Sequence, residues 1–194
     1  MKHIFYHLTA VMVVVVWGMT FISTKVLIVH GLSAQEIFLF RFLLAYAAVC
    51  PISFHRFFAR NLKDELYLVG GGVLGGSLFF FLQNIALGLT QASNVSFIIC
   101  TTPLLTAALT VLSVRMEKVS RGFIHGSIVA LLGVGLLIFN GSFILRISPL
   151  GDLLTLLASL SWAFYSLVIR SLTRKYSPAF ITRKIFFYGI ITIL

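Results

Sequence analysis

The stretch WGMTFISTKVLIVHGLSAQEIFLFRF, from Trp17 to Phe42, holds two apolar runs of membrane-spanning character. Each run carries one cation, Lys25 in the first and Arg41 in the second. A cation at the centre of a membrane span costs about 2.5–3.5 kcal/mol on insertion scales. The stretch therefore indicates two membrane helices whose cations need polar surroundings.

The composition of the whole chain supports a membrane environment. Of 194 residues, 59% are hydrophobic and 10% are charged, and the mean hydropathy is +1.05. An ordinary soluble domain is about 25% charged. The chain has too little polar surface to cover a soluble globule, so we predict an all-α, polytopic membrane helix bundle.

Apolar runs of about 20 residues, the length that crosses a bilayer, recur along the chain. A seventh run begins near Ser177, and we expect the chain to end at Leu194 inside that helix. Serine and asparagine at three helix starts, Ser33, Ser93 and Asn94, are favourable N-caps. The six complete runs lie at about 6–29, 33–54, 66–89, 94–114, 122–139 and 151–172.

The formal net charge of +10 does not indicate nucleic acid as a partner, because the cations cluster between the apolar runs. Apart from Lys25 and Arg41, twelve of the 15 Lys and Arg residues lie at connections on one side, and Arg146 alone lies on the other. The positive-inside rule then places the N-terminus in the cytoplasm. No small-residue cleavage site follows the first run, so we interpret it as a retained helix and not as a secretory signal.

A sequence repeat predicts the architecture. A cation follows Trp17 by eight residues at Lys25, and another follows Trp162 by eight residues at Arg170. LSAQEIF follows the first pair and YSPAFIT the second, at offsets of 145 and 144 residues. Because five helices, an odd number, separate each helix from its copy, the copies point in opposite directions. Inverted repeats of this kind are typical of secondary transporters, whose substrate sites lie near the midplane.

The chain resembles the EamA family of the drug/metabolite transporter superfamily. The resemblance rests on WGMTFISTK, on LSAQEIFLFRF and on the run from Asn84 to Phe139. That run includes TTPLLTAAL with Pro103, RMEKVS with Glu117 and ALLGVGLLIF. GDLLTLLASLSWAFYSLVIR, from Gly151, resembles the start of the family's second repeat.

This resemblance implies a ten-helix transporter fold built from inverted five-helix repeats. Residues 1–140 would form the first repeat and residues 150–194 the start of a second, incomplete one. It implies an exporter of small metabolites, amino-acid-like or other small organic solutes, that works by alternating access in the bacterial plasma (inner) membrane. No cofactor is expected.

Four polar residues are predicted in the outer half of the bilayer. With 1.5 Å of rise per residue, Lys25 lies about 6 Å, Arg41 about 12 Å, and Gln83 and Asn84 about 8–9 Å from the outer ends of their helices. We expect some of them to face a common aqueous cavity, which would favour carboxylate or phosphate substrates. Alternatively, Lys25 anchors its helix at the interface, and the two amides bind neighbouring helices.

Four further residues complete the substrate-pathway candidates. Trp17 and Trp162 lie deeper than an interfacial belt, and with Tyr165 they either line the site or fill the core. Pro103 is expected to break the fourth helix in mid-bilayer, as a hinge or as part of a cavity wall. The GxxxG frames at residues 71–76 and 122–126 predict close helix packing.

No carboxylate is predicted in mid-membrane, because Glu36 and Asp152 fall near outer helix ends and the others in cytoplasmic loops. Proton coupling through these helices is therefore not expected, unless His125 supplies it. The pair Glu117 and Arg121 has the helical spacing of a loop salt bridge.

Two other classes of function remain open. An integral membrane enzyme would need catalytic or metal-ligating motifs, and the chain shows neither; Cys50 and Cys100 lack metal-ligand spacing. A truncated half-transporter would be inactive alone, or would need completion by a homodimer partner or by the missing helices.

Overall fold

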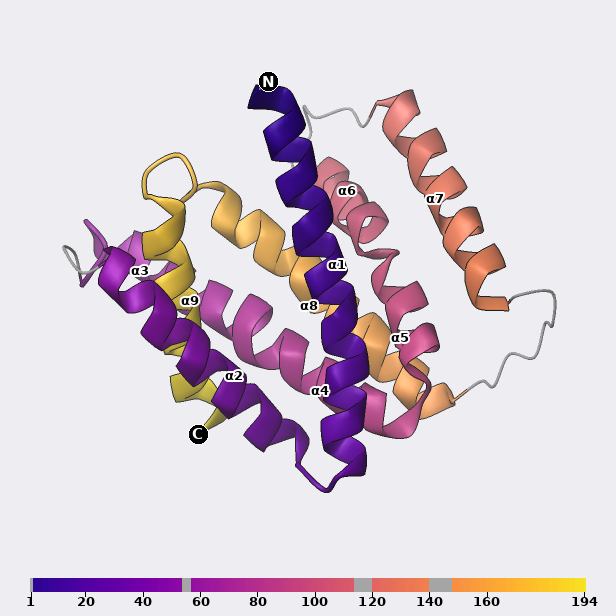
Figure 1. The fold of residues 1–194 in the computed structure, drawn as a ribbon. Coiled ribbons are helices and arrows are strands. Elements are labelled where there is room, and N and C mark those ends of the chain that lie inside the picture. The colour runs from indigo at the N-terminus through magenta and orange to yellow at the C-terminus, as the bar shows by residue number, and fades with distance from the viewer. Residues whose placement is uncertain (1, 54–56, 114–119, 140–147) are drawn as a thin grey trace.

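The computed structural model describes residues 2–53, 57–113, 120–139 and 148–194, which form helices and turns without a strand. The first two helices, α1 (Lys2–Val29) and α2 (Ala34–Val49), meet at an angle, and the chain reverses its direction in the turn between them (Figure 1). Gly31 ends α1 with a φ of 95°, which L side chains rarely adopt. Ser33 then caps α2 in a capping box with Glu36. A short 3₁₀ turn, η1 (Cys50–Ser53), follows α2.

The third span is one continuous path made of three segments. These are α3 (Leu62–Gly71), the π-helical segment η2 (Gly72–Leu78) and α4 (Phe79–Leu89). Its glycines allow close contact: a Cβ on Gly72 would lie 2.4 Å from Tyr188 Cβ, and one on Gly75 would lie 2.4 Å from the Tyr165 ring. The packing predicted for this GxxxG motif is confirmed.

The fourth span is broken, as the position of Pro103 predicts. Helix α5 (Ala92–Ile99) ends before Cys100, and α6 (Thr102–Ser113) begins two residues later. The predicted N-caps at Ser93 and Asn94 are wrong, because α5 begins at Ala92 with Gln91 as its N-cap. Asn94 instead donates from its side chain to Thr90 Oγ1 over 3.3 Å.

The fifth predicted span is α7 (Arg121–Phe139). No atom lies within 4 Å of a Cβ placed on Gly122 or Gly126, so the close packing predicted for that motif is wrong for the described residues. The predicted pair between Glu117 and Arg121 lies outside the described residues, because Glu117 is not among them.

The last two helices belong to the predicted second repeat. They are α8 (Pro149–Arg170) and α9 (Pro178–Ile193). Ser177 accepts a hydrogen bond from Phe180 N and caps α9, as Ser33, 144 residues earlier, caps α2. Both serines are thus N-caps, at positions that the predicted repeat relates.

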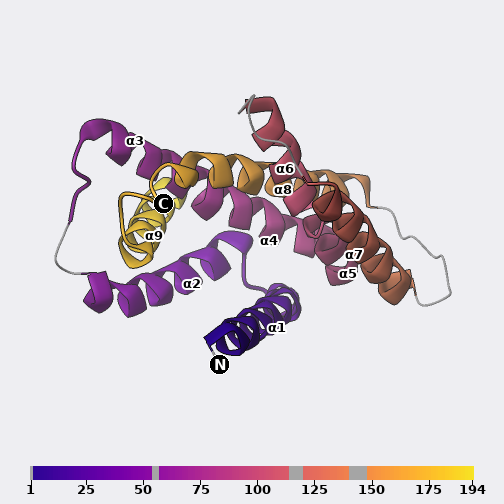
Figure 2. The same cartoon turned by 90° about the horizontal axis from the view of Figure 1, so that it is seen from above.

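Helices α4 and α8 pack side by side at the centre of the bundle (Figure 2). Helices α2 and α9 lie on one side of this pair, and α5, α6 and α7 lie on the other. Two pairs of aromatic residues that the predicted repeat relates, 145 and 144 positions apart, contact each other in this arrangement. The Trp17 and Trp162 rings are 6.0 Å apart, and the Phe42 and Phe186 rings are 5.0 Å apart.

Within the described residues, five helical stretches are long and apolar enough to cross a membrane. The described apolar part of α7, Arg121–Gly133, is shorter. Helix α1 exposes apolar side chains along most of its length, which suits a helix surrounded by lipid. The prediction of a polytopic membrane helix bundle is confirmed. The five stretches are Ile4–Val29, Ala34–Ser53, Leu62–Leu89, Ala92–Ser113 and Pro149–Arg170.

Candidate functional site

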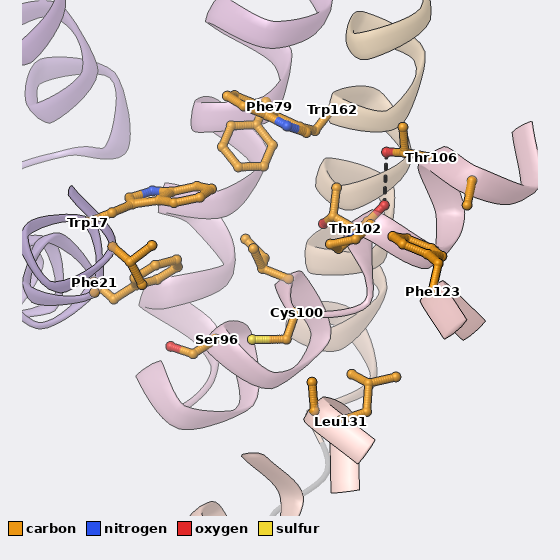
Figure 3. A pocket seen from close by; sticks show the side chains of 16 residues that line it. Trp17, Phe21, Phe79, Ser96, Cys100, Thr102, Thr106, Phe123, Leu131 and Trp162 are labelled. Carbon is orange, nitrogen blue, oxygen red and sulfur yellow. Dashed lines mark hydrogen bonds between the residues drawn. The ribbon is translucent and has the colours of Figure 1, made fainter. Parts of the chain in front are cut away.

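A pocket of about 690 Å³ lies between α1, α4, the α5–α6 break, α7 and α8 (Figure 3). Its volume falls within the range of small-molecule sites. Three sequence candidates, Trp17, Pro103 and Trp162, line it. Because these residues come from α1, α6 and α8, the pocket lies between the first predicted repeat and the start of the second.

The break between α5 and α6 forms one wall of the pocket. Pro103 has no backbone N–H, so it cannot donate the helical hydrogen bond that would join the two segments. The backbone turns at this point: Leu104 N and Leu105 N both donate to Thr101 O, over 2.9 and 3.1 Å. Irregular backbone at membrane depth is tolerated where protein or a cavity surrounds it, and Cys100 and Thr102 beside the break line the pocket.

Aromatic rings form the opposite wall. The ring of Trp162 lies 6.0 Å from that of Trp17 and 4.7 Å from that of Phe79. Phe21, buried on α1, adds a further ring to this wall, while Phe123 on α7 lines the pocket on the side of Thr102. Figure 3 shows Trp17, Phe79 and Trp162 grouped on the side of the pocket away from Leu131.

Three of the described residues that line the pocket, Ser96, Thr102 and Thr106, carry a hydroxyl group. Of these, only the Thr102 hydroxyl donates no hydrogen bond. Thr106 Oγ1 donates to Thr102 O over 2.9 Å, and Ser96 Oγ donates to Ala92 O over 2.7 Å. Both bonds lie within one helix. Thr102 is 7% exposed, and its hydroxyl oxygen has no hydrogen-bond partner.

The two cations in the membrane have partners away from the pocket. Lys25 Nζ donates to the carbonyl of Leu87 and, over 3.0 Å, to that of Thr90. These carbonyls lie at the C-terminal end of α4, where a helix favours positive charge. Arg41 Nη1 donates to Thr24 Oγ1 over 2.9 Å, which joins α2 to α1. Neither cation lines the pocket.

The remaining candidates also lie outside the pocket lining. Gln83 and Asn84 are both 1% exposed inside the bundle. Asn84 Nδ2 donates to Ala34 O over 3.1 Å, while Gln83 Oε1 has no partner. Tyr165 packs against the Trp162 ring at 5.0 Å and so supports the aromatic wall from behind.

A polar network joins helices at the N-terminal end of α8. Asp152 accepts from Ser148 N over 3.1 Å and from Thr90 Oγ1 over 3.4 Å. Ser148 Oγ donates to Leu89 O over 3.2 Å. With the bonds from Lys25 to Leu87 and Thr90, the network links α1, the end of α4 and the start of α8.

A second network lies beyond the other end of α8. Lys175 forms an ion pair of 2.8 Å with Asp64, which also accepts from Tyr176 over 2.8 Å. The hydrogen bond from Lys175 to Asp64 raises the pKa of the Lys175 amine above its ordinary value. Asp64 lies in the first turn of α3, not in a loop as the sequence predicts.

Glu65, next along α3, extends this network into α9. It pairs with Lys184, accepts from Tyr188, and accepts from Ala59 N over 2.6 Å. Lys184 is only 4% exposed, and it lies inside α9 and not in the preceding link. Sequence reasoning missed these partners, although it did place the residues on one side of the membrane.

Sequence reasoning also missed most of the pocket lining. Thr102 is signalled only by its place beside Pro103, and nothing in the sequence distinguishes Phe79 from the chain's other phenylalanines. Among the described residues, no three His, Cys, Asp or Glu side chains are close enough together to hold a metal ion.

Comparison with known proteins gives one match. A family model described as the EamA-like transporter family matches residues 4–139, which is more than half of the chain. No curated protein matches the chain. No solved structure matches it either.

Proposed function

Because the chain belongs to the EamA-like transporter family, we propose that it exports small organic solutes, amino-acid-like ones among them, by alternating access. Its place is the plasma membrane, in bacteria the inner membrane, with the N-terminus in the cytoplasm. The charge distribution along the sequence supports this orientation.

The pocket is the main observation that supports the proposed transport function. It is large enough for a small organic solute, it lies between the predicted repeats, and a broken helix forms its wall. Sites in secondary transporters commonly combine these three features. Trp17, Pro103 and Trp162 contact the solute in this proposal, while Lys25, Arg41, Gln83, Asn84 and Tyr165 hold the surrounding helices in place.

The two polar networks support alternating access. They lie at opposite ends of α8, whose 22 residues span about 33 Å. Each network joins helices of the first predicted repeat to the second: Thr90 to Asp152 at one end, and Glu65 to Lys184 at the other. Breaking one while the other holds would open the pocket to one side at a time.

The repeat assignment is part of the proposal: residues 1–140 form the first repeat and residues 150–194 belong to the second. Near a two-fold axis, residues meet their own counterparts. The contacts of Trp17 with Trp162 and of Phe42 with Phe186 fit this expectation. Such an axis in the membrane plane would relate the two alternating states.

Transport into inverted membrane vesicles tests the function. A panel of labelled small organic solutes is tested, amino acids and uncharged compounds among them, and at least one should enter vesicles that carry the protein faster than vesicles without it. Ala107→Trp, which places a large ring in the pocket, should abolish that uptake. The control is Ala108→Trp, the same change at an exposed neighbour outside the pocket lining, which should retain it. Equal uptake by the two variants would refute the pocket as the solute path.

Orientation is tested by labelling with a membrane-impermeant maleimide in a variant without Cys50 and Cys100. Lys63→Cys should be labelled only in inverted vesicles, and Leu150→Cys only in intact cells; both positions are exposed. The opposite pattern would reverse the orientation. Cross-linking in the same vesicles reports whether the active unit holds one copy or two.

A further inference from the structure

We propose that the pocket selects flat, uncharged solutes that carry a hydrogen-bonding group, an inference that rests on the transport function proposed above. It differs from the sequence-based expectation of an anionic substrate, and within the proposed range of small organic solutes it favours uncharged ones over amino acids. The difference arises because the structure separates the cations of the outer half-membrane from the pocket.

The first argument is charge. None of the 16 described residues that line the pocket is ionised at neutral pH. The amine of Lys25 is bound by carbonyls at the end of α4, and Arg41 binds Thr24. A charged solute would lose its water in the pocket without gaining an opposite charge, which is strongly unfavourable. Carboxylates, phosphates and amines are therefore disfavoured in this site.

The second argument is shape. The ring of Trp162 lies 6.0 Å from that of Trp17 and 4.7 Å from that of Phe79, so one wall consists of aromatic surfaces. Flat rings gain offset-stacked and edge-to-face contacts on such a wall beyond the gain from apolar burial. Aromatic faces also attract cations, but no carboxylate lines the pocket to complete a cation site.

The third argument is the single hydroxyl with a free hydrogen. Thr102 lies 93% buried beside the helix break, and its oxygen has no partner, whereas the hydrogens of Ser96 and Thr106 are used within their own helices. Leaving a buried polar group unpaired is costly. A rotation about the Cα–Cβ bond lets the Thr102 hydroxyl pair with one polar group of the solute. An amide or carbonyl on a flat ring satisfies all three arguments.

Intrinsic fluorescence reports binding directly, because both of the chain's tryptophans, Trp17 and Trp162, line the pocket. The full chain in lipid nanodiscs is titrated at neutral pH with four probes of similar size: benzamide, benzoate, benzylamine and cyclohexanecarboxamide. Benzamide should bind about tenfold or more tightly than benzoate and benzylamine. It should bind about threefold more tightly than cyclohexanecarboxamide, which lacks the flat ring.

Two isosteric variants test the hydroxyl. Thr102→Val should weaken benzamide binding by about two- to tenfold, since one hydrogen bond is lost. Thr110→Val removes a hydroxyl of the same helix that lies outside the pocket lining and donates to Thr106 O over 2.7 Å, and it should leave benzamide binding unchanged. Circular dichroism of both variants checks that the helices are retained.

Benzoate or benzylamine binding as tightly as benzamide would overturn the inference. So would the absence of a fluorescence change with all four probes, or equal effects of the two threonine variants. The vesicle assay is scored separately: if Ala107→Trp blocks uptake and charged solutes are preferred, the transport function stands and the solute class is wrong. If benzamide binds as expected and Ala107→Trp leaves uptake unchanged, the proposed function fails and the binding site remains.

Discussion

Replacement of Gly72 by alanine tests whether close packing of η2 on α9 stabilises the bundle. The added Cβ would lie 2.4 Å from Tyr188 Cβ and 3.2 Å from Gly189 N, while ordinary contacts begin at 3.4 Å. Both neighbours belong to the backbone or to its first side-chain atom, so no side-chain rotation relieves the clash. Helix α9 would have to move away by about 1 Å, a shift of the kind that overpacking forces.

The expected cost follows from two opposing contributions. Overpacking costs about 1–3 kcal/mol. Alanine is favoured over glycine inside a helix by about 0.5–1 kcal/mol. At the middle of both ranges, the net loss in the free energy of unfolding is about 1 kcal/mol, which lowers the melting temperature by about 2–4 °C on the scale for chains of this length. Circular dichroism of the protein in detergent micelles measures the loss of helix on heating.

Gly126→Ala in α7 is the matched control, because no described atom outside the glycine's own helix backbone lies within 4 Å of a Cβ added there. Its melting temperature should stay unchanged or rise, since only the helix preference of alanine acts. If Gly72→Ala melts at the same temperature as Gly126→Ala, then the packing argument for the third span is wrong.

Three further predictions concern the polar residues. Thr24→Val leaves the Arg41 guanidinium without its partner on α1 and should lower the free energy of unfolding by about 1–3 kcal/mol, measured by titration with sodium dodecyl sulfate. Lys25→Met removes the donor to the end of α4 and should cost about 1–2 kcal/mol, while the order of benzamide over benzoate in the fluorescence titration stays the same. If Lys25→Met weakens benzoate binding more than benzamide binding, then Lys25 lies in the solute path. The third prediction is a pH dependence: because Asp64 raises the pKa of Lys175, the bond contributes stability below the ordinary pKa of 10.5 and loses it as the pH rises through the higher folded value. The melting temperature of Lys175→Met should therefore fall short of the wild type by a constant amount from about pH 7 to 9, and the gap should narrow above about pH 10.5.

Local features of this protein follow from the sequence. Apolar runs of span length indicate where a helix crosses the membrane, because each backbone group in lipid must be bonded within its own helix. The caps at Ser33 and Ser177 and the break at Pro103 depend on neighbours a few residues away, and the structure confirms all three.

The errors in the sequence prediction have a common physical cause. The GxxxG spacing is present both in the third span and in α7, yet only the third-span glycines meet another helix. The GxxxG spacing allows another helix to approach closely, but it does not show whether a second helix packs against the glycines. In the same way, the sequence predicts that Glu65 and Lys184 lie on the same side of the membrane, but it cannot show that Lys184 reaches Glu65.

The sequence by itself determined the solvent, the span positions, the helix caps and the family resemblance, because composition and short-range spacing decide each of them. The tertiary structure alone decided which residues surround the pocket. When a helix is apolar on all sides, its sequence does not indicate which face packs against other helices and which face contacts lipid. The partner of Lys25 lies 62 residues away at Leu87, and that contact turns a predicted cavity cation into a cap on α4. The packing of α1 against α4, with the ring of Trp17 beside that of Trp162, therefore decided that both tryptophans line the pocket and that no described residue of the lining is charged.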